Sequence, residues 1–235
     1  MTTPSALPKF IQISEMLIRE IAAGHLADGA KLPPERDMAA QLGISVGTLR
    51  KSLADMQTKG MLERIHGSGN YVRAKSDVRS VYAFFRLEKI TGGGLPTARV
   101  LSVERMQKPK DAPQFGPSRD AHRIRRMRWL DTDLIALEEI WLDASHRDQI
   151  TASDLSDSLY LFYRTQLDLV IASVEDRIGC GPLPDWAPPE FHLRPGTTLG
   201  YIERVSRTGS GDPAEFSRTW FDTDNARYIS RMGRG

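Results

Sequence analysis

The chain has 235 residues, and 40% of them are hydrophobic, which excludes a disordered chain. It has a single cysteine, Cys180, which excludes an internal disulfide. It contains neither an apolar run long enough to span a membrane nor a signal peptide, so we expect a cytoplasmic protein without a membrane partner. The formal net charge is +2, and the basic excess lies in residues 1–74, where nine Lys and Arg face seven Asp and Glu; this excess is too small to establish nucleic-acid binding by itself.

Three helices are predicted in the first 60 residues, because apolar residues recur there at spacings of three and four. The first helix ends near Gly24, the second begins near Pro34 and ends at Gly43, and the third begins after Ser45 and ends near Gly60. The residues expected to be buried are, in chain order, Phe10, Ile13, Leu17, Ile21, Met38, Leu42, Leu49, Leu53 and Met56.

Two short extended runs follow the third helix, Leu62–Ile65 and Asn70–Val72, and the sequence HGSG joins them. Two glycines in so short a connection supply the positive φ angles of a hairpin loop. Helices joined at a glycine turn, with a β-hairpin behind them, predict a winged helix-turn-helix domain over residues 1–74. In such a domain the third helix enters a DNA major groove and the hairpin reaches phosphates or the adjacent minor groove.

The exposed side of the third helix has side chains suited to DNA. Arg50 can donate two hydrogen bonds to a guanine edge or bind a phosphate, and Ser45 and Thr48 near the helix start can bind phosphates. His66 and Gly67 at the hairpin tip allow the backbone to approach DNA closely. The alternative is a small helical domain that binds protein and leaves Arg50 solvated.

A polar stretch over residues 75–82 is predicted to be a linker, and strand-like runs become frequent after it. The helical pattern of this part of the chain is confined to Ala152–Leu167. We therefore expect a separate α+β domain over residues 83–235, with one or two helices packed on an antiparallel sheet. The strand-like runs are residues 81–86, 98–106, 123–130, 134–142, 169–178, 200–207 and 214–221.

Charged residues in these runs predict a binding pocket. Arg126 and Arg128 are two apart on one strand and so share a face, and the returning strand brings Glu138 or Glu139 opposite them. The predicted helix opens with serines, a natural anion site, and Glu215 follows on a later strand. The residues fit a pocket for a small polar or anionic molecule, and they fit equally a solvated sheet face with cross-strand ion pairs.

Residues 24–72 resemble the DNA-binding domain of the GntR family of bacterial transcription regulators. The resemblance implies that Arg36 holds phosphate, that Ser45, Thr48 and Arg50 lie in or beside the major groove, and that His66 and Gly67 form the wing contact. Val46 and Gly47 stand where the family usually has a basic residue, so the operator sequence stays open. The positions on the family pattern are Leu32, Pro33, Glu35, Arg36, Leu42, Gly43, Ser45, Thr48, Leu49, Arg50, Gly60, Gly67, Gly69 and Val72.

The stretch from about Ser80 to Met232 is similar to the effector-binding domain of the HutC subgroup of this family, the UTRA domain, which has a chorismate-lyase-like fold. The matching segments are RMR (126–128), ALEEIWL (136–142), SLY (158–160), LRPGTTLGYIERV (193–205) and DPAEFSRTWF (212–221). In relatives that bind phosphorylated amino sugars, the pocket-lining positions correspond to Arg126, Arg128, Glu138, Ser158, Tyr160, Glu215 and Phe221. Phe221 stands where those relatives often have tyrosine.

These observations predict a homodimeric transcription regulator, most often a repressor in this subgroup, that binds double-stranded operator DNA. A small effector, a sugar phosphate, amino acid or organic acid, would release it. The alternatives are an enzyme of small acidic metabolites whose DNA-binding domain controls its own synthesis, and an adaptor that binds protein. The sequence contains no GxSxG, HExxH or dinucleotide glycine motif, and its histidines and Cys180 are too scattered for a metal site, so we expect no catalytic residue, metal or cofactor.

Overall fold

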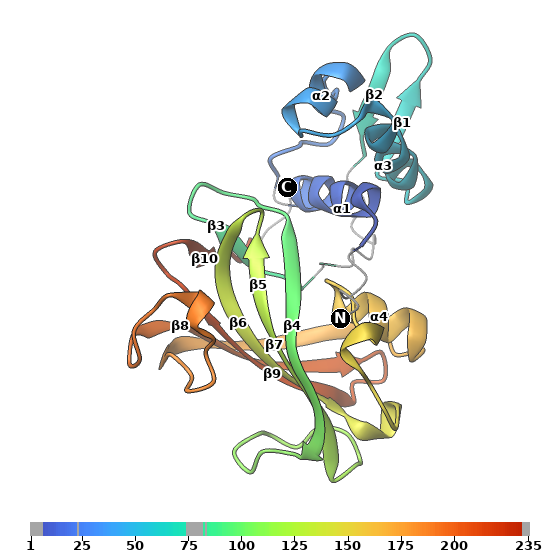
Figure 1. Cartoon of the computed structure of the whole chain (residues 1–235). Coiled ribbons are helices and arrows are strands. Elements are labelled where there is room, and N and C mark those ends of the chain that lie inside the picture. Colours follow the sequence, from blue (N-terminus) through green and yellow to red (C-terminus); the bar gives the residue numbers. More distant parts are fainter. Residues whose placement is uncertain (1–6, 23, 74–81, 83, 232–235) are drawn as a thin grey trace. The chain divides into compact units, whose positions relative to one another are not determined.

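The computed structural model describes residues 7–22, 24–73, 82 and 84–231, which form two compact units (Figure 1). The N-terminal unit contains the described residues up to Arg86 and residues 229–231, and the C-terminal unit contains residues 87–228. The linker expected over residues 75–82 lies outside the described residues except for Tyr82. That side chain is buried in the N-terminal unit, edge-on to Phe85.

The N-terminal unit has the predicted order of three helices and a hairpin. Ser45 caps the third helix as expected, because its Oγ accepts the backbone N–H of Thr48 at 3.1 Å. Gly43 and Gly60, which follow the second and third helices, have φ angles of +62° and +70°. The elements are α1 (Lys9–Ala22), α2 (Glu35–Gln41), α3 (Val46–Thr58), β1 (Leu62–Ile65) and β2 (Gly69–Val72), with β1 antiparallel to β2.

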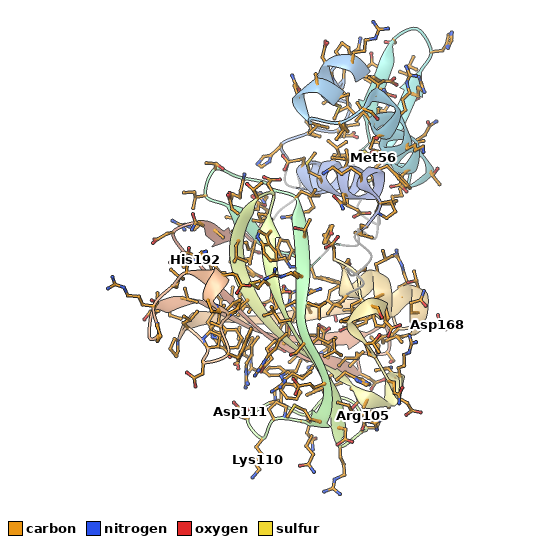
Figure 2. The ribbon with its side chains drawn as sticks, viewed as in Figure 1. Met56, Arg105, Lys110, Asp111, Asp168 and His192 are labelled. Atoms are coloured by element: carbon orange, nitrogen blue, oxygen red, sulfur yellow. The ribbon has the colours of Figure 1, made fainter. Side chains whose placement is uncertain are left out.

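One hydrophobic core holds this unit together, and Met56 lies fully buried within it (Figure 2). The expectation that Phe10 and Leu42 are buried is wrong, because both are half-exposed, Leu42 as the C-cap residue of α2. A buried polar contact also joins α1 to α3: Lys59 Nζ lies 2.6 Å from Glu15 and 2.8 Å from Asp55. Burying the Glu15 carboxylate requires this cation beside it.

The C-terminal unit is built on a six-stranded antiparallel sheet in the order β4-β5-β6-β9-β8-β7 (Figure 1). Its strands are β4 (Pro96–Gln107), β5 (Asp120–Leu130), β6 (Asp133–Asp143), β7 (Ile171–Pro182), β8 (Thr198–Thr208) and β9 (Pro213–Phe221). Two further short strands, β3 (Leu87–Lys89) and β10 (Ala226–Tyr228), pair with each other.

The helical prediction for Ala152–Leu167 resolves into a 3-10 turn over Ala152–Asp154 and the helix α4 (Leu159–Gln166). The strand expected over residues 81–86 is wrong, since residues 82 and 84–86 lie in turns and irregular chain just before β3. No helix among the described residues has the length and apolar character needed to cross a membrane.

Strand register gives the large sheet two different faces, because opposite residues of antiparallel strands share a face. On one face, Arg126 lies opposite Glu138 on β5 and β6, and Glu215 lies opposite Ser206 on β9 and β8. The helix α4 packs on this face through Tyr160 and Tyr163. The other face carries a hydrophobic cluster of Met127, Leu137, Leu183, Phe191, Leu199 and Trp220. We call these the α4 face and the aromatic face.

Gly200 of β8 lies directly under the ring of Phe221, its cross-strand neighbour on β9. A Cβ at position 200 would lie 2.2 Å from Cζ of that ring. We predict that Gly200→Ala destabilises the C-terminal unit by ~1–3 kcal/mol, as overpacking of a core does. Denaturant unfolding measures the change, with Gly209→Ala as the control because a Cβ there meets no atom within 4 Å. Equal stability of the two variants would contradict this packing.

Candidate functional site

The N-terminal half of α3 and the residues around it form an exposed polar surface. Ser45, Gly47 and Arg50 are exposed, and so is Arg36 in the first turn of α2. Thr48 is half-buried, and its Oγ1 lies 2.9 Å from Ser45 Oγ. The residues of these two helices that are predicted to contact DNA therefore lie within one unit. They are accessible to solvent, although Thr48 and Val46 are partly buried.

Val46, which replaces the usual basic residue, has a structural role in this unit. Its side chain is half-buried and packs against the hydrophobic core. Gly47 leaves open space, since the closest contact of a Cβ there would be Ser45 Oγ at 3.8 Å. The first five residues of α3 and its cap therefore carry three polar side chains, those of Ser45, Thr48 and Arg50.

Glu35 positions the arginine of α3, a role that the sequence interpretation missed. Arg50 Nε donates to Glu35 Oε2 at 2.6 Å, and Arg64 of β1 lies 3.4 Å from the other oxygen of the same carboxylate. The hydrogen bond from Arg50 lowers the pKa of Glu35, so the carboxylate stays charged. One carboxylate thus joins α2, α3 and the hairpin. The spacing of Glu35 and Arg50 gives no sequence signal for this contact, because a turn separates their helices.

The tip of the hairpin projects as the wing prediction requires. His66 and Gly67 are exposed in the turn between β1 and β2, and Gly67 has a φ of +73° that favours glycine. Lys31 lies near the hairpin, with its ammonium 6.0 Å from the centre of the Tyr71 ring.

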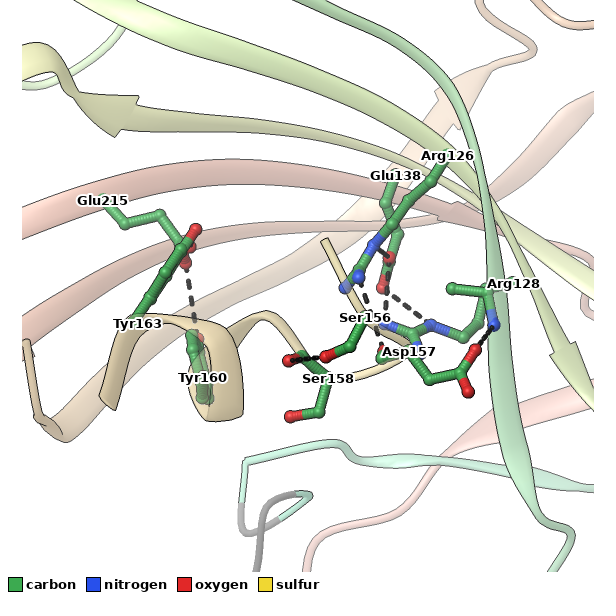
Figure 3. Close-up of polar contacts among 10 residues, drawn as sticks. Arg126, Arg128, Glu138, Ser156, Asp157, Ser158, Tyr160, Tyr163 and Glu215 are labelled. Carbon is green, nitrogen blue, oxygen red and sulfur yellow. Dashed lines mark hydrogen bonds and ion pairs between the residues drawn. The ribbon is translucent and has the colours of Figure 1, made fainter. Parts of the chain in front are cut away.

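In the C-terminal unit, Arg126 and Arg128 converge on Glu138 on the α4 face, as the strand register predicted (Figure 3). Arg126 Nε donates to Glu138 Oε2, and Arg128 Nη2 donates to the same oxygen at 3.1 Å. Both guanidiniums also donate to the backbone carbonyl of Asp157, at 3.4 and 3.0 Å. Their side chains are only 6% and 4% exposed, which excludes a solvated sheet face at this position.

Glu138 is a charged group inside this cluster. Burial by itself raises its pKa, but the charges of Arg126 and Arg128 outweigh burial and lower the pKa to about 2. The Asp157 carboxylate accepts the backbone N–H of Ala98 at 2.9 Å, which ties the segment before α4 to β4. The cluster is therefore a buried network of ion pairs and hydrogen bonds that connects β4, β5, β6 and the segment before α4.

Glu215 belongs to a second cluster, under α4. Tyr160 and Tyr163 lie beside its carboxylate (Figure 3), to which Tyr163 Oη donates a hydrogen bond. Ser206 Oγ donates to the same carboxylate at 2.7 Å, and Tyr160 Oη lies 2.9 Å from Ser206 Oγ. Burial raises the pKa of Glu215, and it also raises the pKa values of the two tyrosines. The sequence interpretation did not include Tyr163, although a spacing of three from Tyr160 places both on one side of a helix.

The seven residues predicted for the effector site all lie on or beside the α4 face, but in separate groups. Leu142, the partner of Glu215, is four residues from Glu138 along β6, about 13 Å of strand. Ser158 lies between the clusters and caps α4 by accepting the N–H of Leu161 at 3.3 Å. Phe221 is buried over Gly200 on the Arg128 side of the same face. Arg126 is close enough to Glu215 for its charge to act on that carboxyl.

A cavity of about 390 Å³ lies elsewhere, near the end of β4 where Arg105 is labelled in Figure 2. None of the predicted site residues lines it. The lining residues are Arg105, His122, Asp148, Gln149, Ile150 and Thr151. His122 is buried there with Nε2 2.6 Å from the carbonyl of Arg147, so its position is explained by the fold. In the part of the chain that the structure describes, no three His, Cys, Asp or Glu side chains group as metal ligands.

Comparison with protein families identifies both units. The model described as "Bacterial regulatory proteins, gntR family" matches residues 11–72. The model described as "UTRA domain" matches residues 92–227, more than half of the chain. The order of these two matches is the HutC-like architecture that the sequence predicted.

Relatives cover nearly the whole chain. The HTH-type transcriptional regulator SmoD of Agrobacterium fabrum is 58% identical over 98% of both chains. The Escherichia coli repressor MngR, named for a mannosyl-D-glycerate transport and metabolism system, is 29% identical over 94% of both. The crystal structure of the possible transcriptional regulator YydK from Bacillus subtilis has the same fold, with a TM-score of 0.55 and 22% identity over 97% of this chain and all of that one. The chain therefore belongs to the gntR family of bacterial regulatory proteins and is a transcription regulator with a UTRA domain.

Proposed function

We propose that the protein is a cytoplasmic, homodimeric repressor that leaves its operator when a small anionic or polar metabolite binds to the α4 face. The observation that carries the proposal is the pair of buried arginines, Arg126 and Arg128, which share Glu138 beside the start of α4. Repression is proposed because MngR, a relative of similar length, is a repressor.

On the DNA side, the proposal assigns Arg36, Ser45, Thr48, Arg50, His66 and Gly67 to operator contacts, with Val46 and Gly47 at the start of α3. Support comes from their exposure and from the cap that orders the first turn of α3. Arg50 would exchange its bond with Glu35 for a base edge or a phosphate. Glu35 thus presents the guanidinium in a fixed direction before DNA arrives.

On the effector side, the proposal assigns Arg126, Arg128, Glu138, Ser158, Tyr160, Glu215 and Phe221 to the pocket. Two guanidiniums can hold a carboxylate or a phosphate through paired hydrogen bonds. An anionic effector would take over some of the donors that Glu138 and the Asp157 carbonyl now use. Carboxylic acids, amino acids and sugar phosphates meet this requirement. Mannosyl-D-glycerate, for which MngR is named, is also a carboxylate.

The regulation would be a shift between two populations of the dimer. Two winged units related by a two-fold axis meet operator half-sites about one helical turn apart. The effector releases DNA only if it binds more tightly to the arrangement in which both half-sites cannot be reached. Because the segment before α4 supplies the Asp157 carbonyl, a ligand at the arginines would act first on α4.

Replacing Arg50 tests the DNA surface. Arg50→Ala removes a guanidinium at the start of α3, and we expect operator affinity to fall by ~1–3 kcal/mol with no change in dimerisation. Gel-shift titration against operator DNA measures the affinity, and Gln57→Ala, exposed on the last turn of α3, is the matched control. An unchanged affinity for Arg50→Ala would count against α3 as the recognition helix.

Replacing Arg128 tests the effector site. A thermal-shift screen of sugar phosphates, amino acids and organic acids first finds a ligand, since one at 100 times its Kd adds about 2.7 kcal/mol of stability. Arg128→Ala should still bind operator but should not be released by that ligand. Arg125→Ala is the control, because Arg125 is on the aromatic face and pairs with Glu139 at 2.8 Å. Normal release from Arg128→Ala would place the effector elsewhere.

Glu138 also predicts a pH effect on stability. Its pKa is about 2 in the folded chain and 4.5 ordinarily, so its ion pairs stabilise the fold fully above about pH 4.5 and lose that effect as the pH falls toward 2. Glu138→Gln should therefore lose less unfolding free energy than the wild type between pH 5 and pH 3. Denaturant unfolding at several pH values measures this, and Glu104→Gln, half-exposed on β4, serves as the control. Parallel profiles for wild type and Glu138→Gln would contradict the assignment.

A further inference from the structure

The six-stranded sheet has two edges, and the structure treats them differently. At the β4 edge, the N–H of Ala98 is bound by the Asp157 carboxylate, and Arg105 donates to the carbonyl of Asp148 at 3.1 Å. At the β7 edge, no strand of the described chain pairs with the outer side, along all of Ile171–Pro182. An uncovered edge of this length presents a row of backbone donors and acceptors to another strand.

The side chains of β7 leave part of this edge accessible to another strand, since its proline and its bulge lie at the two ends of the strand. Ile178 is 55% exposed. The stretch Gly179, Cys180 and Gly181 leaves the backbone accessible, and no lysine occurs along the strand. The exposed charges are Glu175 and Arg177, 50% and 77% exposed, which pair with each other at 3.1 Å along the strand.

The sequence of β7 is complementary to itself about Asp176. If two copies of β7 pair antiparallel with Asp176 at the two-fold axis, Glu175 of each lies opposite Arg177 of the other. Val174 of each copy then lies opposite Ile178 of the other on the α4 face. The two-fold axis thus gives two apolar pairs on that face and two ion pairs on the other. Shifting the centre to Glu175 or Arg177 would place like charges opposite each other.

Asp176 itself does not oppose this register. Its carboxylate faces β8, where Arg204 donates to it at 2.6 and 2.7 Å, and Tyr228 Oη donates to it at 2.8 Å. Its side chain is 8% exposed. The two Asp176 groups at the axis would therefore each be neutralised within their own chain.

We propose that β7 is the dimer interface: it pairs antiparallel with β7 of a second copy about Asp176, and the two sheets become one. This deepens the proposed homodimer by naming its surface, and it rests on that part of the proposed function. A dimer of this kind places both α4 faces on the same side of the joined sheet, because the two-fold axis is perpendicular to the sheet.

Charge exchange tests the interface. Arg177→Glu places Glu175 opposite a carboxylate of the second copy, and we expect the dimer dissociation constant in sedimentation velocity to rise at least tenfold. Glu175→Arg combined with Arg177→Glu restores opposite charges and should recover the wild-type constant. Arg194→Glu, exposed in the loop before β8, is the control for net charge. A wild-type constant for Arg177→Glu, or no recovery in the double variant, would overturn the proposal.

Crosslinking tests the register. In a Cys180→Ser background, Val174→Cys combined with Ile178→Cys should give a covalent dimer on mild oxidation. In the proposed register, the thiol at position 174 of one copy lies opposite the thiol at position 178 of the other. Neither single variant should do so. Val174→Cys with native Cys180 should crosslink much more slowly, because those positions are opposite only if the register moves by two residues.

The outcomes separate this interface from the proposed function. A protein that is dimeric on operator DNA but gives no crosslink between the thiols introduced at positions 174 and 178 overturns the β7 interface and leaves the repressor proposal intact. A protein that is monomeric both free and on operator DNA overturns the homodimer and the interface together. Crosslinked dimer that still binds operator, and is still released by the effector, supports both.

Discussion

A carboxylate buried in a β-sheet needs cations around it, and Glu138 sets this constraint for the C-terminal unit. Its two arginines must come from the neighbouring strand at positions that share its face, which fixes the register of β5 against β6. Their remaining donors bind the Asp157 carbonyl, which holds the segment before α4. The same residues that satisfy the buried charge thus determine where the helix begins, and a ligand that competes for them acts on the helix directly.

In the N-terminal unit, an arginine at the surface is also paired with a carboxylate of the same chain. The proposed DNA contact requires Arg50 to be exposed and yet held in one direction. Glu35 holds it by a single short hydrogen bond, and Arg64 shares the same carboxylate. Exposed ion pairs contribute little stability, so exchanging this bond for a DNA contact costs little. In both units an arginine to which we assign a binding role is paired within the chain, and the proposed ligand or operator would take over its donors.

The proposed dimer edge connects these units to regulation. Effector binding on the α4 face can influence DNA binding only if two chains are held in a fixed relation, because one winged unit meets one half-site. The exposed β7 edge, with its self-complementary charges, provides such a relation through backbone pairing rather than through a large apolar surface. The aromatic face is already occupied by its own cluster around Trp220.

The sequence by itself determined the helices, the hairpin, most strands of the sheet and the family, because these follow from periodicity, glycine positions and local motifs. It also predicted that Glu138 or Glu139 would lie opposite the arginines of β5, since strand alternation and a short turn fix that pairing to within one residue. Only the tertiary structure decided that Glu35 holds Arg50, that Tyr163 and Ser206 surround Glu215, that Val46 packs inward and that residues 82 and 84–86 lie in no strand. Some of these features are contacts between segments far apart in the chain, and the others depend on how an element packs. Periodicity in the sequence predicts neither kind of feature.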